Sequence, residues 1–504
     1  MASIEANFLT ELGKSIELFK PEFALLITFV LAVILDIVFK KSKNITAVIG
    51  LAGLVVTGIF LWQQSATESL TFQGLAVIDP FGQFFKILIL ISTVIVILMS
   101  FQSKELYKDD RSVGEYYTLI LGMTIGMFLL SGAVNLVLIY LAIETMSLSS
   151  YVLAGYTKEI KRSSEASLKY VIYGAISSGV MIYGISLLFG LTGSLNLLEI
   201  NQFLMGNDVA VFPVVLAGVM IIAGIGYKIS AVPFHFWTPD VYEGAPVTIT
   251  AYLSVASKAA GFAILIRFLK SGFVDMSAVT DAGAWAVLAN FDWQLLIAIL
   301  SVLTMTLGNL VALWQTNVKR LLAYSSIAHA GYLLMGVVVM TELGIASVLI
   351  YFVMYMLMNL GAFLIVLMFA NKIGSEEIDD YAGIGYQAPF LGACMVLFLI
   401  SLTGLPPTAG FIGKLFIFTA VLKSDFIWLA VVGVLNSVVS LYYYVKIFRN
   451  MYLKGVDNPG EPMQFSFGGQ LLVLALAIPT LVFGILYEPI AEWAKNSVSI
   501  FLGM

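Results

Sequence analysis

Charged residues are scarce in this sequence. Aspartate, glutamate, lysine and arginine make up 11% of its 504 residues, whereas soluble proteins carry roughly 25%. So few charges cannot cover the surface of a water-soluble fold of this size. Hydrophobic residues form 60% of the chain, so most of its surface needs lipid as a solvent. The composition therefore predicts a membrane protein.

Residues that hold redox centres and metals are also scarce. Cys394 is the one cysteine, so the chain forms no internal disulfide and holds no iron–sulfur cluster by itself. The two histidines, His235 and His329, argue against haem pairs or a histidine-rich metal site. The sequence has no Walker loop and no GxGxxG turn after a strand. We expect no cofactor and no metal in this chain, and no nucleic-acid partner.

Long apolar runs dominate what is present. A helix of about 20 residues crosses the ~30 Å of hydrocarbon in a bilayer, and in lipid the backbone must satisfy its own hydrogen bonds. The runs lack the alternation over about ten residues that barrel strands show. We predict an all-α polytopic membrane protein with about fourteen transmembrane helices. The segments are 21–39, 45–62, 76–101, 115–131, 133–153, 166–190, 209–242, 247–271, 293–315, 320–340, 344–370, 387–421, 427–449 and 469–489.

Two of these segments are too long for one straight helix and contain prolines. The seventh includes GYKISAVPFHFWTPD with Pro233, and the twelfth includes SLTGLPPTAGFIGK with Pro406 and Pro407. Proline removes a backbone donor and clashes with the preceding turn, so both helices should be discontinuous. A broken helix is tolerated in a membrane only where protein buries it or where it lines a wet cavity.

The two breaks lie five helices apart, which suggests an internal repeat. A repeated unit with an odd number of helices must be inverted in its second copy, a common plan among transporters. We therefore predict two inverted five-helix repeats, helices 4–8 and 9–13. The expected divisions are residues 1–114 for helices 1–3, 115–271 and 272–449 for the repeats, and 450–504 for the last helix.

Basic residues set the expected orientation. Most of them lie in the loops after odd-numbered helices, and the positive-inside rule places such loops in the cytoplasm. Both termini then lie on the non-cytoplasmic side. The residues are Lys40, Lys41, Lys43, Lys104, Lys108, Arg111, Lys158, Lys161, Arg162, Lys319, Arg320, Lys372, Lys446, Arg449 and Lys454.

Five lysines lie within the apolar segments instead: Lys86, Lys169, Lys228, Lys258 and Lys414. A charge at the centre of a membrane helix costs roughly 2.5–3.5 kcal/mol on insertion scales. One lysine could extend its amine to the membrane surface, and this alternative is strongest for Lys169, near a helix end, and for Lys86. Several lysines near segment centres predict a shared polar interior.

Glu144 supplies a negative charge near the middle of the fifth helix, in LVLIYLAIETMSL. A free lysine titrates near pH 10.4, burial lowers the pKa of an amine, and a nearby carboxylate raises it again. Movement of Glu144 toward or away from Lys228 would therefore switch that amine between holding and releasing a proton. The alternative role for Glu144 is that of a structural carboxylate that takes no part in proton transfer.

The histidines extend this hypothesis, because imidazole titrates near neutral pH. His235 lies at the break in the seventh helix, and His329 lies in SSIAHAGY; each is a relay candidate, with a buried core histidine as the alternative. We expect Lys228, Lys258, His235 and Lys414 to follow one hydrated line near the bilayer midplane.

Three stretches carry a resemblance to a known family. YKISAVPFHFWTPDVYEGAPVTITAYLSVASK (227–258) resembles the core of the antiporter-like subunits of respiratory complex I and of multisubunit cation/proton antiporters. ETMSLSSYVLAGY (144–156) and GLPPTAGFIGKLFIF (404–418) resemble the subunit N branch of NADH-quinone oxidoreductase, called subunit 2 in organelles. Sister subunit M carries glutamate where this chain has Lys414. The resemblance covers about residues 75–450.

The resemblance implies a proton-translocating membrane-arm subunit. Glu144 would pair with Lys228, Lys258 would be the central relay, and Lys414 would lead to the outer exit. FMN, the iron–sulfur clusters and quinone would belong to partner subunits, and the partners would be a neighbouring antiporter-like subunit and small membrane subunits. The location would be a bacterial inner membrane or its organellar equivalent. The alternatives are a subunit of a multisubunit Na⁺/H⁺ antiporter, a non-catalytic membrane scaffold and a transporter of a soluble substrate.

Overall fold

The apolar segments fold as helices, the arrangement that satisfies every backbone group without water. The computed structural model describes residues 2–39, 44–64, 68–108, 113–279, 284–288, 291–454 and 461–499. Four basic residues used above to predict orientation lie outside the described residues, namely Lys40, Lys41, Lys43 and Arg111.

Within the described residues, eleven helical spans are long and apolar enough to cross a membrane, so the chain is a multi-pass membrane protein. They are Lys20–Val38 (α2), Ile45–Gln63 (α3), Pro80–Ser100 (α4), Leu136–Ala154 (α6), Lys161–Thr192 (α7), Val211–Ile229 (α9), Val247–Phe273 (α11 to α12), Trp293–Ala312 (α13), Val318–Val338 (α14), Glu342–Ile373 (α15) and Ile427–Tyr452 (α19). Further apolar helices are Gly114–Gly132 (α5), Pro389–Thr403 (α17), Ala409–Leu422 (α18) and Phe467–Val482 (α20).

Both predicted proline breaks are present. Helix α9 ends at Ile229, and the chain resumes as α10 (Trp237–Gly244) after Pro233. Helix α17 ends at Thr403, and α18 begins at Ala409 after the two prolines. Each first half ends in a residue with left-handed backbone, Ser230 (φ 62°) and Gly404 (φ 88°). Each break therefore exposes carbonyl groups at a helix end inside the protein.

A third interruption was not predicted. Between α11 (Val247–Tyr252) and α12 (Lys258–Phe273), residues Leu253–Ser257 form a π-helical turn. This stretch has no proline, so local sequence gives no sign of it. Single π turns inside α-helices occur often at functional sites. The turn places Lys258 at the first position of α12.

Several short elements lie outside the predicted segments. They are amphipathic or polar, so a search for apolar runs does not find them. The helices are Ala2–Leu18 (α1), Leu197–Gly206 (α8), Ile384–Gln387 (α16) and Glu488–Ser499 (α21), with a 3₁₀ turn at Ile378–Tyr381. The all-α expectation holds apart from two antiparallel hairpins in the described chain, β1 (Ser69–Thr71) with β2 (Ala76–Ile78) and β3 (Val274–Val279) with β4 (Trp285–Val287).

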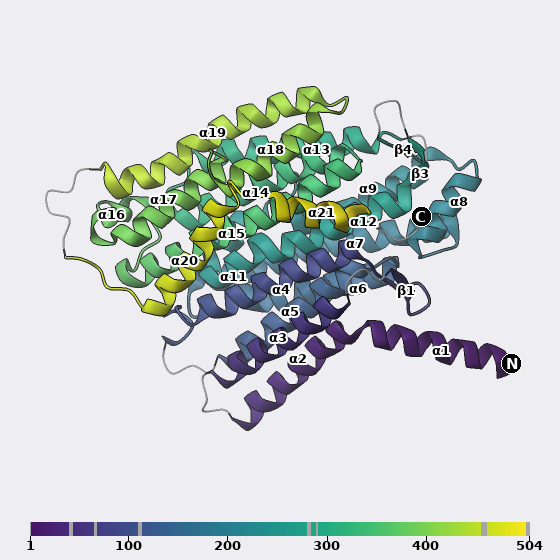
Figure 1. The fold of residues 1–504 in the computed structure, drawn as a ribbon, viewed down its shortest axis with the longest axis horizontal. Helices are drawn as coiled ribbons and strands as arrows, with labels where there is room; N and C mark the ends of the chain where they lie inside the picture. Colours follow the sequence, from purple (N-terminus) through teal and green to yellow (C-terminus); the bar gives the residue numbers. More distant parts are fainter. Residues whose placement is uncertain are drawn as a thin grey trace.

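Helix α15 forms the centre of the bundle and is buried around its whole circumference. Figure 1 shows α15 in the middle of the molecule, with α21 crossing over it and α1 reaching away from the bundle. Helices α11, α14, α17 and α18 pack against α15. Both the π turn and the second proline break therefore lie beside the same central helix.

Candidate functional site

Three of the predicted lysines are buried beside the three helix interruptions. Lys228 and Lys258 are each 1% exposed, and Lys414 is 4% exposed. Lys414 Nζ donates to the carbonyl of Thr403, the last residue of α17, over 2.7 Å. The freed carbonyls at the end of a helix carry partial negative charge, so they stabilise an amine that cannot reach water. The proline break thus provides a binding partner for Lys414.

Aromatic rings surround Lys228. Its Nζ lies 5.3–5.9 Å from the ring centres of Tyr151, Tyr170 and Tyr227, and 3.4 Å from the Tyr170 hydroxyl. Tyr170 in turn stacks on Trp237 of α10 with ring centres 4.4 Å apart. Aromatic faces attract a cation, and the attraction is larger where water is excluded. This cage can hold the amine while it is charged.

Glu144 does not form an ion pair with Lys228, although both residues are described. The carboxylate is partly buried on α6 and accepts a hydrogen bond from Ser178 of α7. Tyr170, which contacts Lys228, lies two turns from Ser178 on the same helix. Tyr151, which contacts Lys228, lies two turns after Glu144 on α6. Helices α6 and α7 therefore link the two charges, and a shift of either helix would change their separation.

His329 connects the other two lysines. Its Nδ1 lies 2.6 Å from the Tyr351 hydroxyl and its Nε2 lies 3.1 Å from the Tyr444 hydroxyl. The centres of the His329 and Tyr332 rings are 5.9 Å apart, Lys414 lies over the Tyr332 ring, and Lys258 binds the carbonyl of Ser326, one turn before His329. A neutral imidazole has one donor and one acceptor nitrogen, so this ring can both take and give a proton. The structure brings Lys258, His329 and Lys414 into one polar cluster.

The remaining contacts of this cluster come from neighbouring helices. Lys258 Nζ donates to the carbonyl of Ser326 on α14 over 2.7 Å. Lys414 Nζ donates to Ser437 Oγ over 3.1 Å and lies 4.6 Å from the centre of the Tyr332 ring. The two amines therefore contact α14 one turn before and one turn after His329, at Ser326 and at Tyr332.

A close helix crossing joins Lys228 to this cluster. Gly261 of α12 packs against α9, and a Cβ at Gly261 would lie 2.6 Å from Ile229 Cγ2 and 3.6 Å from Lys228 Cβ. Only glycine permits such a short approach. Because Lys258 lies one turn before Gly261, the crossing sets the separation between Lys228 and Lys258.

His235 and Lys169 occupy other surroundings. His235 is buried in the first break, and among the described contacts its Nδ1 has no hydrogen-bond partner. Lys169 has a partly exposed side chain that pairs with Glu165 at 2.7 Å and Asp240 at 2.6 Å. Asp240 also pairs with Arg320 of α14 at 2.6 Å. No described contact joins His235 or Lys169 to the three buried lysines.

A polar stripe on α15 was missed by the sequence analysis. Tyr351, Tyr355 and Asn359 follow one another at intervals of four residues, so they share one side of the helix. Tyr351 contacts His329, and Asn359 Nδ2 donates to Ser254 of the π turn over 2.6 Å. The spacing is visible in the sequence, but Tyr and Asn are uncharged, so a search for charged residues within apolar runs does not find them.

Two buried ion pairs were also missed. Arg267 of α12 donates to both carboxylate oxygens of Asp79 at 2.8 and 2.9 Å, and neither side chain is exposed. Lys86 of α4 pairs with Glu22 of α2 at 2.5 Å, again away from solvent. Each pair joins two helices. The Glu22 partner gives Lys86 a structural role in the first group of helices.

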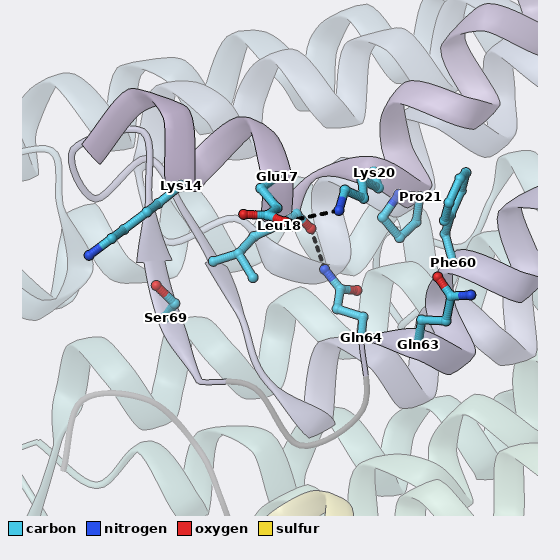
Figure 2. Close-up of a pocket in the computed structure, with 9 residues that line it drawn as sticks. All are labelled: Lys14, Glu17, Leu18, Lys20, Pro21, Phe60, Gln63, Gln64 and Ser69. Atoms are coloured by element: carbon cyan, nitrogen blue, oxygen red, sulfur yellow. Dashed lines mark hydrogen bonds and ion pairs between the residues drawn. The ribbon is translucent and has the colours of Figure 1, made fainter. Parts of the chain in front are cut away.

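Figure 2 shows a pocket of about 400 Å³ where α1, α2 and α3 meet. Its lining includes Lys14, Glu17 and Lys20, and the ion pair between Lys20 and Glu17 has side chains 53% and 70% exposed. None of its residues belongs to the buried cluster.

Over the parts of the chain that the structure describes, no group of three His, Cys, Asp or Glu residues is placed to hold a metal ion.

Comparison with known proteins identifies the family. Residues 133–440 match the family described as NADH:quinone oxidoreductase/Mrp antiporter, transmembrane. NADH-quinone oxidoreductase subunit N 2 of Chloroherpeton thalassium is 49% identical over 489 residues, covering 96% of this chain and 94% of that protein. The chain belongs to the subunit N family. Subunit N of Chlorobium chlorochromatii is 45% identical over 508 residues, covering 98% and 97%.

A solved structure agrees with membership of the subunit N family. A chain of respiratory complex I from Thermus thermophilus, determined with bound aureothin, matches with a TM-score of 0.77 and 29% identity. The match covers 94% of this chain and 98% of that chain. The resemblance read from the three sequence motifs is therefore confirmed, and Glu144, Lys228, Lys258 and Lys414 all lie within the matched family region.

Proposed function

We propose that this chain is a proton-translocating membrane-arm subunit of an NADH-quinone oxidoreductase. It would couple electron transfer from NADH to quinone, carried out in other subunits, to proton movement through its own interior. One observation carries the proposal: Lys258, His329 and Lys414 are all buried and lie along neighbouring turns of α14 in the middle of the bundle. Three such groups are costly in a membrane unless they serve a purpose.

The proposed route uses each group according to its surroundings. Glu144 would act on Lys228 through the packing of α6 and α7 around that amine, and Lys228 would exchange its proton with Lys258 across the α9–α12 crossing. Lys258 would pass the proton to His329, and His329 to Lys414. His235 would relay protons at the first helix break, near Lys228. Lys169, with its carboxylate partners, would occupy the end of the route on the cytoplasmic side.

The proposed architecture has about fourteen transmembrane helices. In it, residues 1–114 hold helices 1–3, residues 115–271 and 272–449 form two inverted repeats, and residues 450–504 hold the last helix. The two proline breaks support this division because each falls in the same position of its repeat. Both termini would lie on the non-cytoplasmic side of a bacterial inner membrane or its organellar equivalent.

The expected partners follow from the chemistry that the chain lacks. FMN, the iron–sulfur clusters and quinone would be held by other subunits of the complex, since a single cysteine supplies no cluster. A neighbouring antiporter-like subunit and small membrane subunits would pack against this chain within the bilayer.

A subunit of a multisubunit Na⁺/H⁺ antiporter is the second candidate, because the matching family description also includes Mrp antiporters. The full-length relatives reported above are both subunit N proteins, which favours the oxidoreductase. Purification in mild detergent separates the two candidates. Co-elution with flavin- and iron–sulfur-containing subunits supports the first, and co-elution with other antiporter subunits alone supports the second.

Replacement of Lys258 tests proton translocation directly. Lys258→Ala should leave the complex assembled but lower proton pumping and coupled quinone reduction at least tenfold, which corresponds to about 1.4 kcal/mol. Lys258→Arg should fail too, because arginine stays protonated. Lys372→Ala, at an exposed lysine, is the control and should retain parental activity. Parental pumping by Lys258→Arg would assign Lys258 a fixed structural charge instead.

A further inference from the structure

Helices α2 and α3 form a hairpin at one edge of the bundle (Figure 1). In their apolar spans, 28% of α2 and 33% of α3 is buried inside the protein, whereas α15 is 100% buried. Most of the surface of this hairpin therefore faces lipid. Polar and charged groups at the end of such a hairpin lie where the bilayer itself meets water.

The pocket of about 400 Å³ lies at one end of this hairpin (Figure 2). Its lining includes Lys20 and Pro21 from the start of α2, and Gln63 and Gln64 from the end of α3. Because both spans meet the membrane surface here, the pocket lies at the level of the lipid headgroups. Trp62, in the last turn of α3, is 82% exposed, and tryptophan is enriched at this level of a membrane.

Helix α1 closes the pocket and is held in place by contacts on two sides. Gln64 Nε2 donates to the carbonyl of Leu18 at the end of α1. The Phe72 N–H donates to Ser15 Oγ over 3.0 Å, and the rings of Phe19 and Phe72 meet edge to face with centres 4.8 Å apart. The walls are therefore fixed by contacts within the protein, so a ligand would bind with little rearrangement.

The ionisable side chains that line the pocket carry a net positive charge. They are Lys14, Lys20 and Glu17, two positive and one negative. Lys20 pairs with Glu17 over 3.1 Å, whereas Lys14 has no ion pair among the described contacts, so its charge is available to a ligand. The hydroxyl of Ser69 and the amide of Gln63 add hydrogen-bonding groups to the lining. This chemistry suits an anion that also carries hydroxyl groups.

We propose that this pocket binds the headgroup of an anionic phospholipid from the surrounding bilayer, with phosphatidylglycerol as the best fit. Its phosphodiester would lie at Lys14, and its glycerol hydroxyls at Gln63 and Ser69. The acyl chains would follow α2 and α3 past Phe60, the apolar ring in the lining. The single negative charge of this lipid balances the net charge of the lining, whereas phosphatidylethanolamine, which is neutral overall, leaves it unbalanced. The bound lipid would join α1 to the hairpin.

The lipid site does not rest on proton translocation. It shares no residue with the buried lysines, and it would exist whether the chain serves an oxidoreductase or an antiporter. Its readout is lipid binding rather than activity. Parental pumping by Lys258→Arg would therefore leave the lipid site standing, and loss of lipid binding would leave the proposed function standing.

Photo-crosslinking of the intact complex in nanodiscs tests for the lipid. The bilayer is phosphatidylcholine with a small fraction of phosphatidylglycerol that carries a diazirine near the top of one acyl chain. Mass spectrometry should find the label concentrated on the last turns of α3 and the first turns of α2. Unlabelled phosphatidylglycerol should lower this labelling, whereas the same fraction of phosphatidylethanolamine, or inorganic phosphate in the buffer, should not.

Three outcomes of this experiment would overturn the proposal. Absence of label from α2 and α3 would show that no lipid occupies the pocket in the complex. Equal competition by phosphatidylethanolamine would show that the pocket does not recognise the charge of the headgroup. Competition by inorganic phosphate would assign the pocket to a free anion instead of a lipid.

Two exposed residues separate the effect of charge from that of fit. Lys14→Gln should lower the labelling about fivefold, the contribution of one lysine near an anionic membrane surface, and Lys14→Arg should retain it. Gln63→Trp should also lower the labelling, because the indole ring fills the pocket without a change of charge. Lys423→Gln is the control, since Lys423 is an exposed lysine at the end of α18, outside the pocket. Parental labelling of Lys14→Gln or of Gln63→Trp would overturn the proposal.

Discussion

The Asp79–Arg267 ion pair gives a quantitative prediction about stability. Asp79 caps the first turn of α4 by accepting from the Gly82 N–H at 2.8 Å, and it accepts two hydrogen bonds from Arg267. Asp79→Asn keeps one carbonyl oxygen for the cap but removes the negative charge. It also turns an amide donor toward the guanidinium, which is itself only a donor. Arg267 keeps the Ser131 carbonyl at 3.1 Å as an acceptor.

The expected cost follows from complete burial. Both side chains have zero exposure, so water cannot replace the lost partner. Breaking a buried pair by removing one charge costs about 3–5 kcal/mol. At about 1.4 kcal/mol per power of ten, the unfolding equilibrium should shift by roughly two to four powers of ten. Asp79→Asn combined with Arg267→Met should recover much of this loss, because an apolar replacement leaves no unpaired charge.

The single cysteine supplies the assay. Cys394 is 8% exposed, so a thiol-reactive dye should label the full chain in mild detergent only as it unfolds. Dye labelling during a thermal ramp then compares the variants. Asp379→Asn is the control, since its ion pair with Lys454 at 2.8 Å lies at the surface and should contribute nothing measurable. If Asp79→Asn unfolded at the same temperature as Asp379→Asn, the pair would not hold α12 to α4.

Two further substitutions probe helix packing. Gly261→Ala should push α9 away from α12, destabilise the chain by about 1–3 kcal/mol and lower coupled pumping. Gly179→Ala is the control, because a Cβ at Gly179 would meet nothing within 4 Å, and it should change neither stability nor pumping. Equal stability and equal pumping of the two variants would contradict the close crossing. Lys86→Met should destabilise the chain, because it leaves the Glu22 carboxylate buried and unpaired. Adding Glu22→Gln should restore most of the lost stability, as measured by dye labelling. A double variant as unstable as Lys86→Met would show that the broken ion pair does not cause the loss of stability.

Much of the candidate site could be predicted because its cost is visible in the sequence. Lys228, Lys258 and Lys414 stand out since a charge in an apolar run needs an explanation wherever the run packs. Their roles in transfer stay predictions. The structure added their partners: the tyrosine rings around Lys228, the Ser326 carbonyl for Lys258 and the Thr403 carbonyl for Lys414.

The predicted close pair of Glu144 and Lys228 shows where sequence reasoning stops. Both charges could be identified, but the distance between them depends on how α6, α7 and α9 pack. The structure places Lys228 against residues of both α6 and α7, Tyr151 and Tyr170, while Glu144 accepts a hydrogen bond from Ser178 of α7. No local pattern in either segment encodes the position of a third helix.

The sequence by itself determined the membrane environment, the helical segments and the two proline breaks. Each of these depends on neighbouring residues alone: the length of an apolar run, or a ring that removes a backbone donor. Only the tertiary structure decided the π turn before Lys258, the alignment of Tyr351 and Tyr355 with His329, and the pairing of Asp79 with Arg267, 188 residues away. Such contacts depend on the packing of whole helices, because the partners come together only when their helices do.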